Sequence, residues 1–239
     1  MADPVRKEAP KPSQPRFGRL RAKDERDKRY RMSAIAPVTT RTKRNWSSTQ
    51  PIWDQGPSPQ CVAYSGNRVL VTRPIVTALT MTHYELYRQC QLVDEWEGED
   101  YAGTSVRACM KVFQSRGIIS SYVWADTIEQ AFPYLMEVGP IHFGCDWTEN
   151  MMETDRYGFI QPNGEVVGGH AVMIKGYSGA KRCPDSSLGA YRIENSWGAD
   201  WGQDGRCWIS VPDMHKLVTG LEGWPADIAS PTEIKVKPA

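Results

Sequence analysis

The chain has 239 residues, of which 40% are hydrophobic and 10% aromatic, so it is long enough for one large domain or two lobes with a packed core. Its net charge is only +1, but residues 1–44 hold 14 Lys/Arg and 5 Asp/Glu, whereas residues 45–239 hold 15 and 23. The sequence therefore predicts a mildly acidic body behind a strongly basic arm, and it contains no apolar run of the about 18 residues that a membrane-spanning helix needs.

The basic arm, residues 1–45, contains five prolines and almost no apolar periodicity, which is typical of an extended segment. Four interpretations stay open: a docking segment for an acidic protein partner, a nucleic-acid tether, a removable pro-segment or a solvated tail. Few aromatic residues accompany the basic ones, which argues against nucleic acid as a partner.

The front half of the body, residues 46–138, is predicted to be a helical lobe. Apolar periodicity indicates helices near 61–72, 75–93, 104–117 and 127–138. Thr104 is a suitable N-cap and Gly117 a suitable residue just past the C-terminus of the third of these helices.

The back half, residues 139–228, is predicted to be a β lobe. Short strand-like runs alternate there with Gly, Pro, Asn and Asp, and residues 229–239 are interpreted as a tail. Helices followed by strands favour an α+β fold with two lobes. The expected strands are 141–143, 158–160, 165–167, 170–177, 191–194 and 207–211.

Cysteine usage and the N-terminus bear on the cellular compartment. Without a C-x-x-C pair we expect no structural zinc site, and no other metal ion or cofactor is expected. The charged N-terminus lacks the apolar segment of a secretory signal, so we expect mostly reduced thiols and a cytoplasmic or virion-associated protein rather than a secreted one. A Cys183–Cys207 bridge under oxidising conditions is the alternative for that pair. The six cysteines are Cys61, Cys90, Cys109, Cys145, Cys183 and Cys207.

Cys61 follows a turn-rich run, Gly56–Pro59, and begins a predicted helix. Unpaired N–H groups and the positive end of the helix dipole favour a thiolate at such a position. Gln55 lies six residues earlier, where its amide could stabilise an oxyanion. The alternative is a small buried core residue, which is the commoner role of a free cysteine.

Two later stretches carry the groups that a cysteine nucleophile needs. His170 begins an apolar strand in GGHAVMIKGY (168–177), and Asn195 follows a strand in YRIENSWGADWGQDGRCWIS (191–210). A base must take the thiol proton and later protonate the leaving amine, and a third group must orient that base. Cys61, His170 and Asn195 supply these three roles in chain order.

These motifs resemble the papain family of cysteine peptidases over roughly residues 46–225. The family carries Q-G-x-x-x-x-C, matched from Gln55 to Cys61, and H-A-V, matched from His170. It also carries N-S-W-G-x-x-W-G-x-x-G, matched completely from Asn195 to Gly205. The resemblance implies a papain-like fold, a helical lobe packed against an antiparallel β lobe with the active-site cleft between them. It also implies hydrolysis of peptide bonds in a polypeptide substrate through an acyl-enzyme.

The resemblance also implies roles for individual residues. Cys61 would be the nucleophile and His170 the general base and then acid. Asn195 would orient His170, and the Gln55 amide with the Cys61 N–H would form the oxyanion hole. Residues implied in lining the cleft or shielding the site are Gly103, Gly169, Ala171 and Trp197.

The chain departs from the family around the nucleophile. The family usually has C-G-S-C-W, whereas this chain has Ser58, Pro59, Gln60, Cys61 and Val62. A disulfide cysteine and a tryptophan are therefore missing, although no reacting group is lost. The chain also shows no counterpart of the long helical pro-region, so it most resembles compact forms from bacteria and their viruses.

Two other functions stay open. The altered nucleophile loop and the basic arm are also compatible with a papain-fold binding or assembly module, in a virion or another complex, with latent or lost activity. The same reacting groups could instead hydrolyse amide bonds in cell-wall peptides or isopeptide links.

His142 and Cys145 lie three residues apart. They are interpreted as packing residues rather than as metal ligands.

Overall fold

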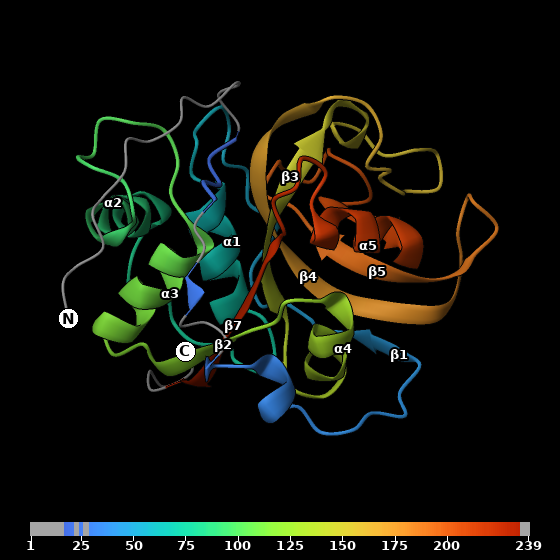
Figure 1. Ribbon diagram of the computed structural model, residues 1–239, viewed down its shortest axis with the longest axis horizontal. Coiled ribbons are helices and arrows are strands. Elements are labelled where there is room, and N and C mark those ends of the chain that lie inside the picture. The colour runs from blue at the N-terminus through green and yellow to red at the C-terminus, as the bar shows by residue number, and fades with distance from the viewer. Residues whose placement is uncertain (1–16, 22–23, 26–28, 235–239) are drawn as a thin grey trace.

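Helices and strands separate into two lobes in the computed structural model, which describes residues 17–21, 24–25 and 29–234 (Figure 1). Three helices gather on one side, and a long antiparallel sheet curves around the other. The α+β class and the two-lobed arrangement predicted from the sequence are confirmed. Among the described residues no helix is long and apolar enough to cross a membrane.

The helical lobe contains α1 (Cys61–Leu70), α2 (His83–Val93) and α3 (Val106–Ser115), together with the strand β2 (Ile119–Trp124). A capping box of Thr82 and Glu85 starts α2, so residues 75–82, predicted to be helical, lie outside it. Ser105 caps α3 in place of the predicted Thr104, because its hydroxyl accepts the N–H of Ala108. The apolar faces of the three helices meet in one buried cluster.

The β lobe is built on β3 (Ile141–Thr148), β4 (Val166–Arg182), β5 (Leu188–Glu194) and β6 (Arg206–Ser210), adjacent and antiparallel in this order. The runs predicted at 165–167 and 170–177 are parts of one long strand, β4. Two helices, α4 (Ile128–Glu137) and α5 (Val211–Thr219), pack against this lobe and contribute to its core. Sequence analysis missed α5, β2 and the short strand β1 (Lys43–Asn45), which pairs with β4.

The prediction of a C-terminal tail from residue 229 is wrong for most of that segment. Strand β7 (Asp227–Ile234) pairs with β2 on one edge and with β3 on the other. It therefore joins the sheet of the β lobe to the helical lobe. Residues 235–239 lie outside the described residues.

The described part of the N-terminal arm belongs to the folded structure. Met32, in a short 3-10 helix (Met32–Ala34), is fully buried in the β-lobe core, and Arg44 donates a hydrogen bond to the Met136 carbonyl of α4. The predicted extended arm is thus partly incorporated into the core. Its remaining residues, 1–16, 22–23 and 26–28, lie outside the described part of the chain.

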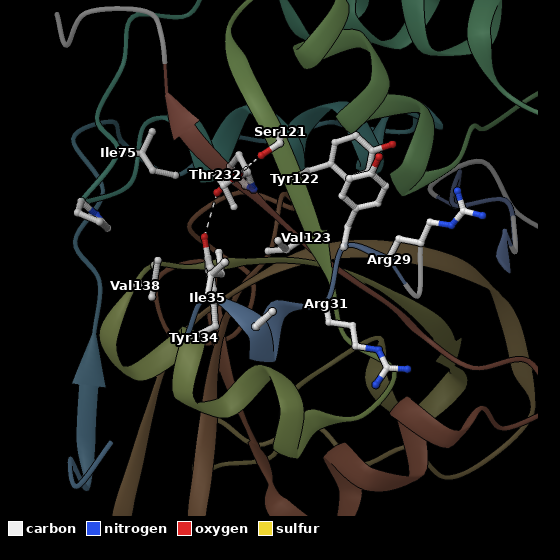
Figure 2. Close-up of a pocket in the computed structure, with 15 residues that line it drawn as sticks. Arg29, Arg31, Ile35, Ile75, Ser121, Tyr122, Val123, Tyr134, Val138 and Thr232 are labelled. Carbon is white, nitrogen blue, oxygen red and sulfur yellow. Dashed lines mark hydrogen bonds between the residues drawn. The ribbon is translucent and has the colours of Figure 1, made fainter. Parts of the chain in front are cut away.

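Where the arm crosses β2 and α4 it helps to enclose a cavity of about 640 Å³ (Figure 2). Apolar side chains such as Ile35, Ile75 and Val138 line it, while Arg29 and Arg31 extend away from them. None of the residues that the sequence proposes for catalysis lines this cavity.

Candidate active site

Cys61 is the first residue of α1 and is completely buried. The preceding turn reverses at Gly56, whose positive φ of 58° suits glycine. The backbone N–H groups of Ala171, Gly18 and Val62 contact the thiol. Cys61 therefore lies against β4 immediately beside His170, and Gly18 of the N-terminal arm covers its thiol.

His170 and Asn195 form the predicted pair. The two side chains meet through a hydrogen bond of 2.8 Å between His170 Nε2 and Asn195 Oδ1, and Asn195 Oδ1 also accepts the N–H of Ser196. The other ring nitrogen, His170 Nδ1, is buried and has no hydrogen-bond partner among the described residues. The ring is thus oriented through Nε2, and Nδ1 is the ring nitrogen that has no hydrogen bond within the described structure. No hydrogen bond joins it to Cys61 in this conformation.

Aromatic rings enclose the imidazole. Trp197 lies over it at 4.7 Å between ring centroids, and Trp147 meets it edge-on at 4.8 Å. Phe17 from the arm closes a third side at 5.9 Å. This packing, in which Trp197 takes part, encloses the His170 ring and explains why His170 has no exposed surface.

Gln55 is held at the start of this site by the Asn195 loop. Its Oε1 accepts the Ser196 hydroxyl at 2.6 Å, and its backbone N–H donates to the Ser196 carbonyl at 2.8 Å. Its Nε2 donates to the Ser58 carbonyl at 2.7 Å, which uses one of its two hydrogens. The loop that follows β5 therefore fixes both the orienting amide of Asn195 and the predicted oxyanion donor.

Residues 17–21 of the arm lie between the two lobes. They fill the place where Gly103 and Gly169 are predicted to line the substrate cleft. Gly18 and Arg19 both donate their N–H to the Gly169 carbonyl, at 3.2 and 3.0 Å. On the opposite side, Leu20 N–H donates to the Thr104 carbonyl and Thr104 N–H to the Gly18 carbonyl, both at 2.8 Å. The chain's own N-terminal segment is therefore paired with both walls of the site.

Several small residues are required by this close packing. A Cβ atom on Gly168 would lie 2.7 Å from the Phe17 ring, and one on Gly169 would lie 2.2 Å from the Arg19 carbonyl oxygen. A Cβ on Gly18 itself would lie 1.9 Å from the Pro59 carbonyl oxygen. The unusual loop before Cys61 thus packs directly on the arm.

Burial controls the protonation of the candidate pair. It raises the pKa of Cys61 to about 11, against the opposing effect of the Ala171, Gly18 and Val62 N–H groups. It lowers the pKa of His170 to about 4, although the hydrogen bond to Asn195 opposes that shift. At neutral pH the pair is therefore a thiol and a neutral imidazole. In this closed arrangement the loss of water around Cys61 therefore favours the thiol over the thiolate that a helix N-terminus favours.

A buried ion cluster supports the site from behind. Glu194 precedes Asn195 and accepts hydrogen bonds from Arg68 of α1, Lys175 of β4 and Arg206 of β6. The Lys175 and Arg206 contacts measure 2.7 and 2.8 Å. The cluster ties α1, which begins at Cys61, to the strand that carries His170. Sequence analysis missed it, and its only signal was a carboxylate directly before the N-S-W-G motif.

The other sequence-based predictions about side chains have mixed outcomes. Cys183 and Cys207 are free rather than bridged, like the other four cysteines. His142 is fully buried with no partner for either ring nitrogen among the described residues, in keeping with packing. Cys145 is buried in the β-lobe core. Within the described chain no group of three or more His, Cys, Asp or Glu residues is arranged to hold a metal ion.

A model of the family described as "Papain family cysteine protease" matches residues 77–217, more than half of the chain. The chain belongs to the papain family. The matched region contains His170 and Asn195 but begins after Cys61, so the nucleophile assignment depends on the sequence motif and on the geometry at α1. The resemblance recognised in the sequence is confirmed.

Curated relatives are papain-family enzymes of animals. Cathepsin B-like cysteine proteinase 6 of Caenorhabditis elegans is 30% identical over 86 residues, which is 36% of this chain and 21% of the relative. A cathepsin B-like cysteine proteinase of Schistosoma japonicum is 34% identical over 71 residues, 30% of this chain and 19% of the relative. The matches thus span about a fifth of these papain-family relatives.

Solved structures show the same fold at low identity. Xylellain, a cysteine protease from Xylella fastidiosa, has a TM-score of 0.66 at 16% identity and covers 98% of this chain and 100% of its own. The bromelain protease from Ananas comosus, solved with the inhibitor E64, has a TM-score of 0.60 at 16% identity. That match covers 81% of this chain and 100% of the bromelain chain. These likenesses establish the papain-like fold of this family member.

Proposed function

We propose that this papain-family chain is a cysteine peptidase that hydrolyses peptide bonds with Cys61 as nucleophile. The observation that carries the proposal is the 2.8 Å hydrogen bond between His170 Nε2 and Asn195, which leaves Nδ1 available on the strand that Cys61 contacts. A nucleophile, a base and a group that orients the base are thereby brought to one place.

The reaction begins when the arm leaves Cys61 and water or substrate enters. His170 Nδ1 takes the thiol proton, and the sulfur attacks the scissile carbonyl carbon. The Cys61 N–H and the Gln55 amide stabilise the oxyanion that forms. His170 then gives its proton to the departing amine, and a water molecule activated by the same imidazole hydrolyses the thioester.

A second candidate function is a binding or assembly module in which the cleft never opens. The complete burial of Cys61 under Gly18 and the neutral state of the Cys61–His170 pair favour it. Against it stands the intact arrangement of Gln55 and Asn195, since a purely structural role has no need of an oriented imidazole.

Covalent labelling with a peptidyl epoxide, followed by intact-mass analysis, tests the proposal. We expect one adduct, mapped to Cys61 and abolished in His170→Ala. Cys207→Ala is the matched control, because it removes another fully buried thiol, on β6 opposite Ile193 rather than opposite His170. Absence of any Cys61 adduct, in a variant whose arm is released as well as in the native chain, would refute peptidase activity and leave the binding module.

A further inference from the structure

The Arg19 side chain lies in an acidic pocket beside Cys61. Its Nε donates to Asp227 Oδ2 at 2.7 Å, its Nη2 to the Pro225 carbonyl at 3.2 Å and its Nη1 to Asp146 Oδ1 at 3.5 Å. The Arg19 and Asp146 side chains are each only 1% exposed, and that of Asp227 is 10% exposed. The guanidinium therefore donates to three oxygen acceptors in a site that is almost closed to water.

The two aspartates come from neighbouring strands and flank a glycine. Gly144 of β3 is in register with Ala171 of β4 and with Asp227 of β7, and Asp146 follows two residues later on β3. A Cβ atom on Gly144 would lie 3.1 Å both from Arg19 Cγ and from Asp227 Oδ2. Glycine at this position thus makes room for a long side chain between the carboxylates.

The pocket has more acceptor capacity than Arg19 uses. Asp146 Oδ2 is buried and has no hydrogen-bond partner among the described residues. Burying carboxylates is costly unless cations compensate them, and Asp146 is compensated only by Arg19 and the partly exposed Arg21 in the described structure. Both cations belong to the arm. When the arm leaves, the two carboxylates of the pocket lose these partners.

The pocket adjoins the site of bond cleavage. Arg19 follows Gly18, whose N–H contacts the Cys61 thiol, and its own N–H pairs with Gly169 next to His170. The Gly18 carbonyl is held by Thr104 N–H, so the arm presents an N–H rather than a carbonyl carbon to the sulfur. The arm therefore occupies the cleft without offering a bond for attack, whereas a substrate must present a carbonyl there.

We propose that the pocket formed by Asp146, Asp227 and Gly144 selects an arginine side chain of the polypeptide substrate, and that Arg19 holds this place until substrate displaces it. The inference rests on the proposed peptidase function and names its substrate class. A planar guanidinium suits the pocket because its several N–H groups can donate hydrogen bonds to two carboxylates and a carbonyl at once. A lysine ammonium is a compact point charge without this planar array of donors.

The experiment uses peptidyl epoxides that differ in one side chain: arginine, its neutral isostere citrulline, lysine or leucine. Second-order labelling rates of Cys61 are measured on the full chain and on Asp227→Asn. We expect the arginine probe to react about 100-fold faster than the citrulline probe. The neutral citrulline side chain leaves the buried carboxylates of Asp146 and Asp227 without a cation, which is strongly unfavourable. Asp227→Asn is expected to reduce that ratio to within a few-fold of one. Asp185→Asn, an isosteric change at the exposed tip of the β4–β5 hairpin, is the control and keeps the native ratio.

The ratio separates selection from simple anchoring of the arm. If Asp227 only anchors Arg19, Asp227→Asn accelerates all four probes together, and equal arginine and citrulline rates on the native chain overturn the inference. The comparison of probes on the native chain needs no variant, so it holds even if Asp227→Asn fails to fold. Equal labelling of Cys61 by all probes refutes the arginine pocket alone, whereas no labelling by any probe, on the native chain and on a variant whose arm is released alike, refutes the proposed function and the pocket with it.

Discussion

Replacing Arg19 with Ala is expected to release the arm from the cleft and expose Cys61. The change removes the contacts to Asp227 and Asp146 and leaves two buried carboxylates without this cation. Removing one partner of a buried ion pair typically costs about 3–5 kcal/mol. We take about 3 kcal/mol, because Arg21 continues to compensate Asp146. At about 1.4 kcal/mol for each factor of ten, the fraction of molecules with an open cleft rises about 100-fold.

The assay is the rate at which a leucine-bearing peptidyl epoxide labels Cys61, since such a probe does not depend on the acidic pocket. The native chain is expected to label slowly and Arg19→Ala up to about 100-fold faster, with a plateau once the open state predominates. Gly18→Ala is a second perturbation, because its new Cβ would lie 1.9 Å from the Pro59 carbonyl oxygen and so displaces the same segment without removing a charge.

Arg41→Ala is the matched control. Arg41 is also an arginine of the arm, but its 2.8 Å ion pair with Glu137 lies on the surface, where such a pair contributes about 0–1 kcal/mol. It is expected to leave the labelling rate unchanged. Equal rates in the native chain, Arg19→Ala and Gly18→Ala, with all three proteins folded, would show that residues 17–21 do not control access to the thiol.

Three further predictions concern turnover and stability. Gln55→Ala is expected to lower kcat by about 10²–10³ with little change in KM, because its amide acts on the oxyanion, and an unchanged kcat in a peptide-hydrolysis assay would contradict that role. Glu194→Gln leaves the buried Arg68 and Lys175 and the partly exposed Arg206 without their shared carboxylate, so the melting temperature is expected to fall by about 10 °C in thermal unfolding. A shift under 2 °C would show that the cluster is not needed. Burial lowers the pKa of His142 to about 3, whereas a histidine in the unfolded chain has a pKa of about 6.5. When the pH falls from 7 to 5.5, the unfolded chain therefore binds a proton at this residue that the folded chain does not bind. This difference lowers the free energy of unfolding by about 1 kcal/mol. His142→Leu is expected to remove that part of the pH dependence in urea titrations at the two pH values, and an unchanged slope would refute it.

The chemistry-bearing motifs could be found in the sequence because their signals are local. The turn before Cys61, the strand that begins near His170 and the loop at Asn195 each lie within one short stretch. The starts of α1, α3 and α4 lie close to their predicted positions for the same reason, whereas α5 was missed and residues 75–82 had the apolar content of a helix although the capping box lies at Thr82.

The missed features depend on partners that are distant in the chain. Strand β7 contains Pro231 and no regular alternation, and only its pairing with β2 and β3 makes it a strand. Arg19 had the sequence surroundings of a solvated basic tail, and its ion pair with Asp227 joins positions 208 residues apart. No local pattern could indicate that contact, nor the neutral state of Cys61 that accompanies the closed arm.

The position of β7 has a consequence for how the molecule is made. Asp227 is its first residue, and the strand supplies hydrogen bonds to both lobes. Because a ribosome synthesises the chain from its N-terminus, Arg19 emerges long before the carboxylate that receives it. Neither the acidic pocket nor the closure of the arm can be complete until nearly all of the described chain has been translated. A nascent chain that has not yet reached β7 therefore lacks the Asp227 side of the acidic pocket, and Arg19 can be held in the cleft only after that strand has emerged.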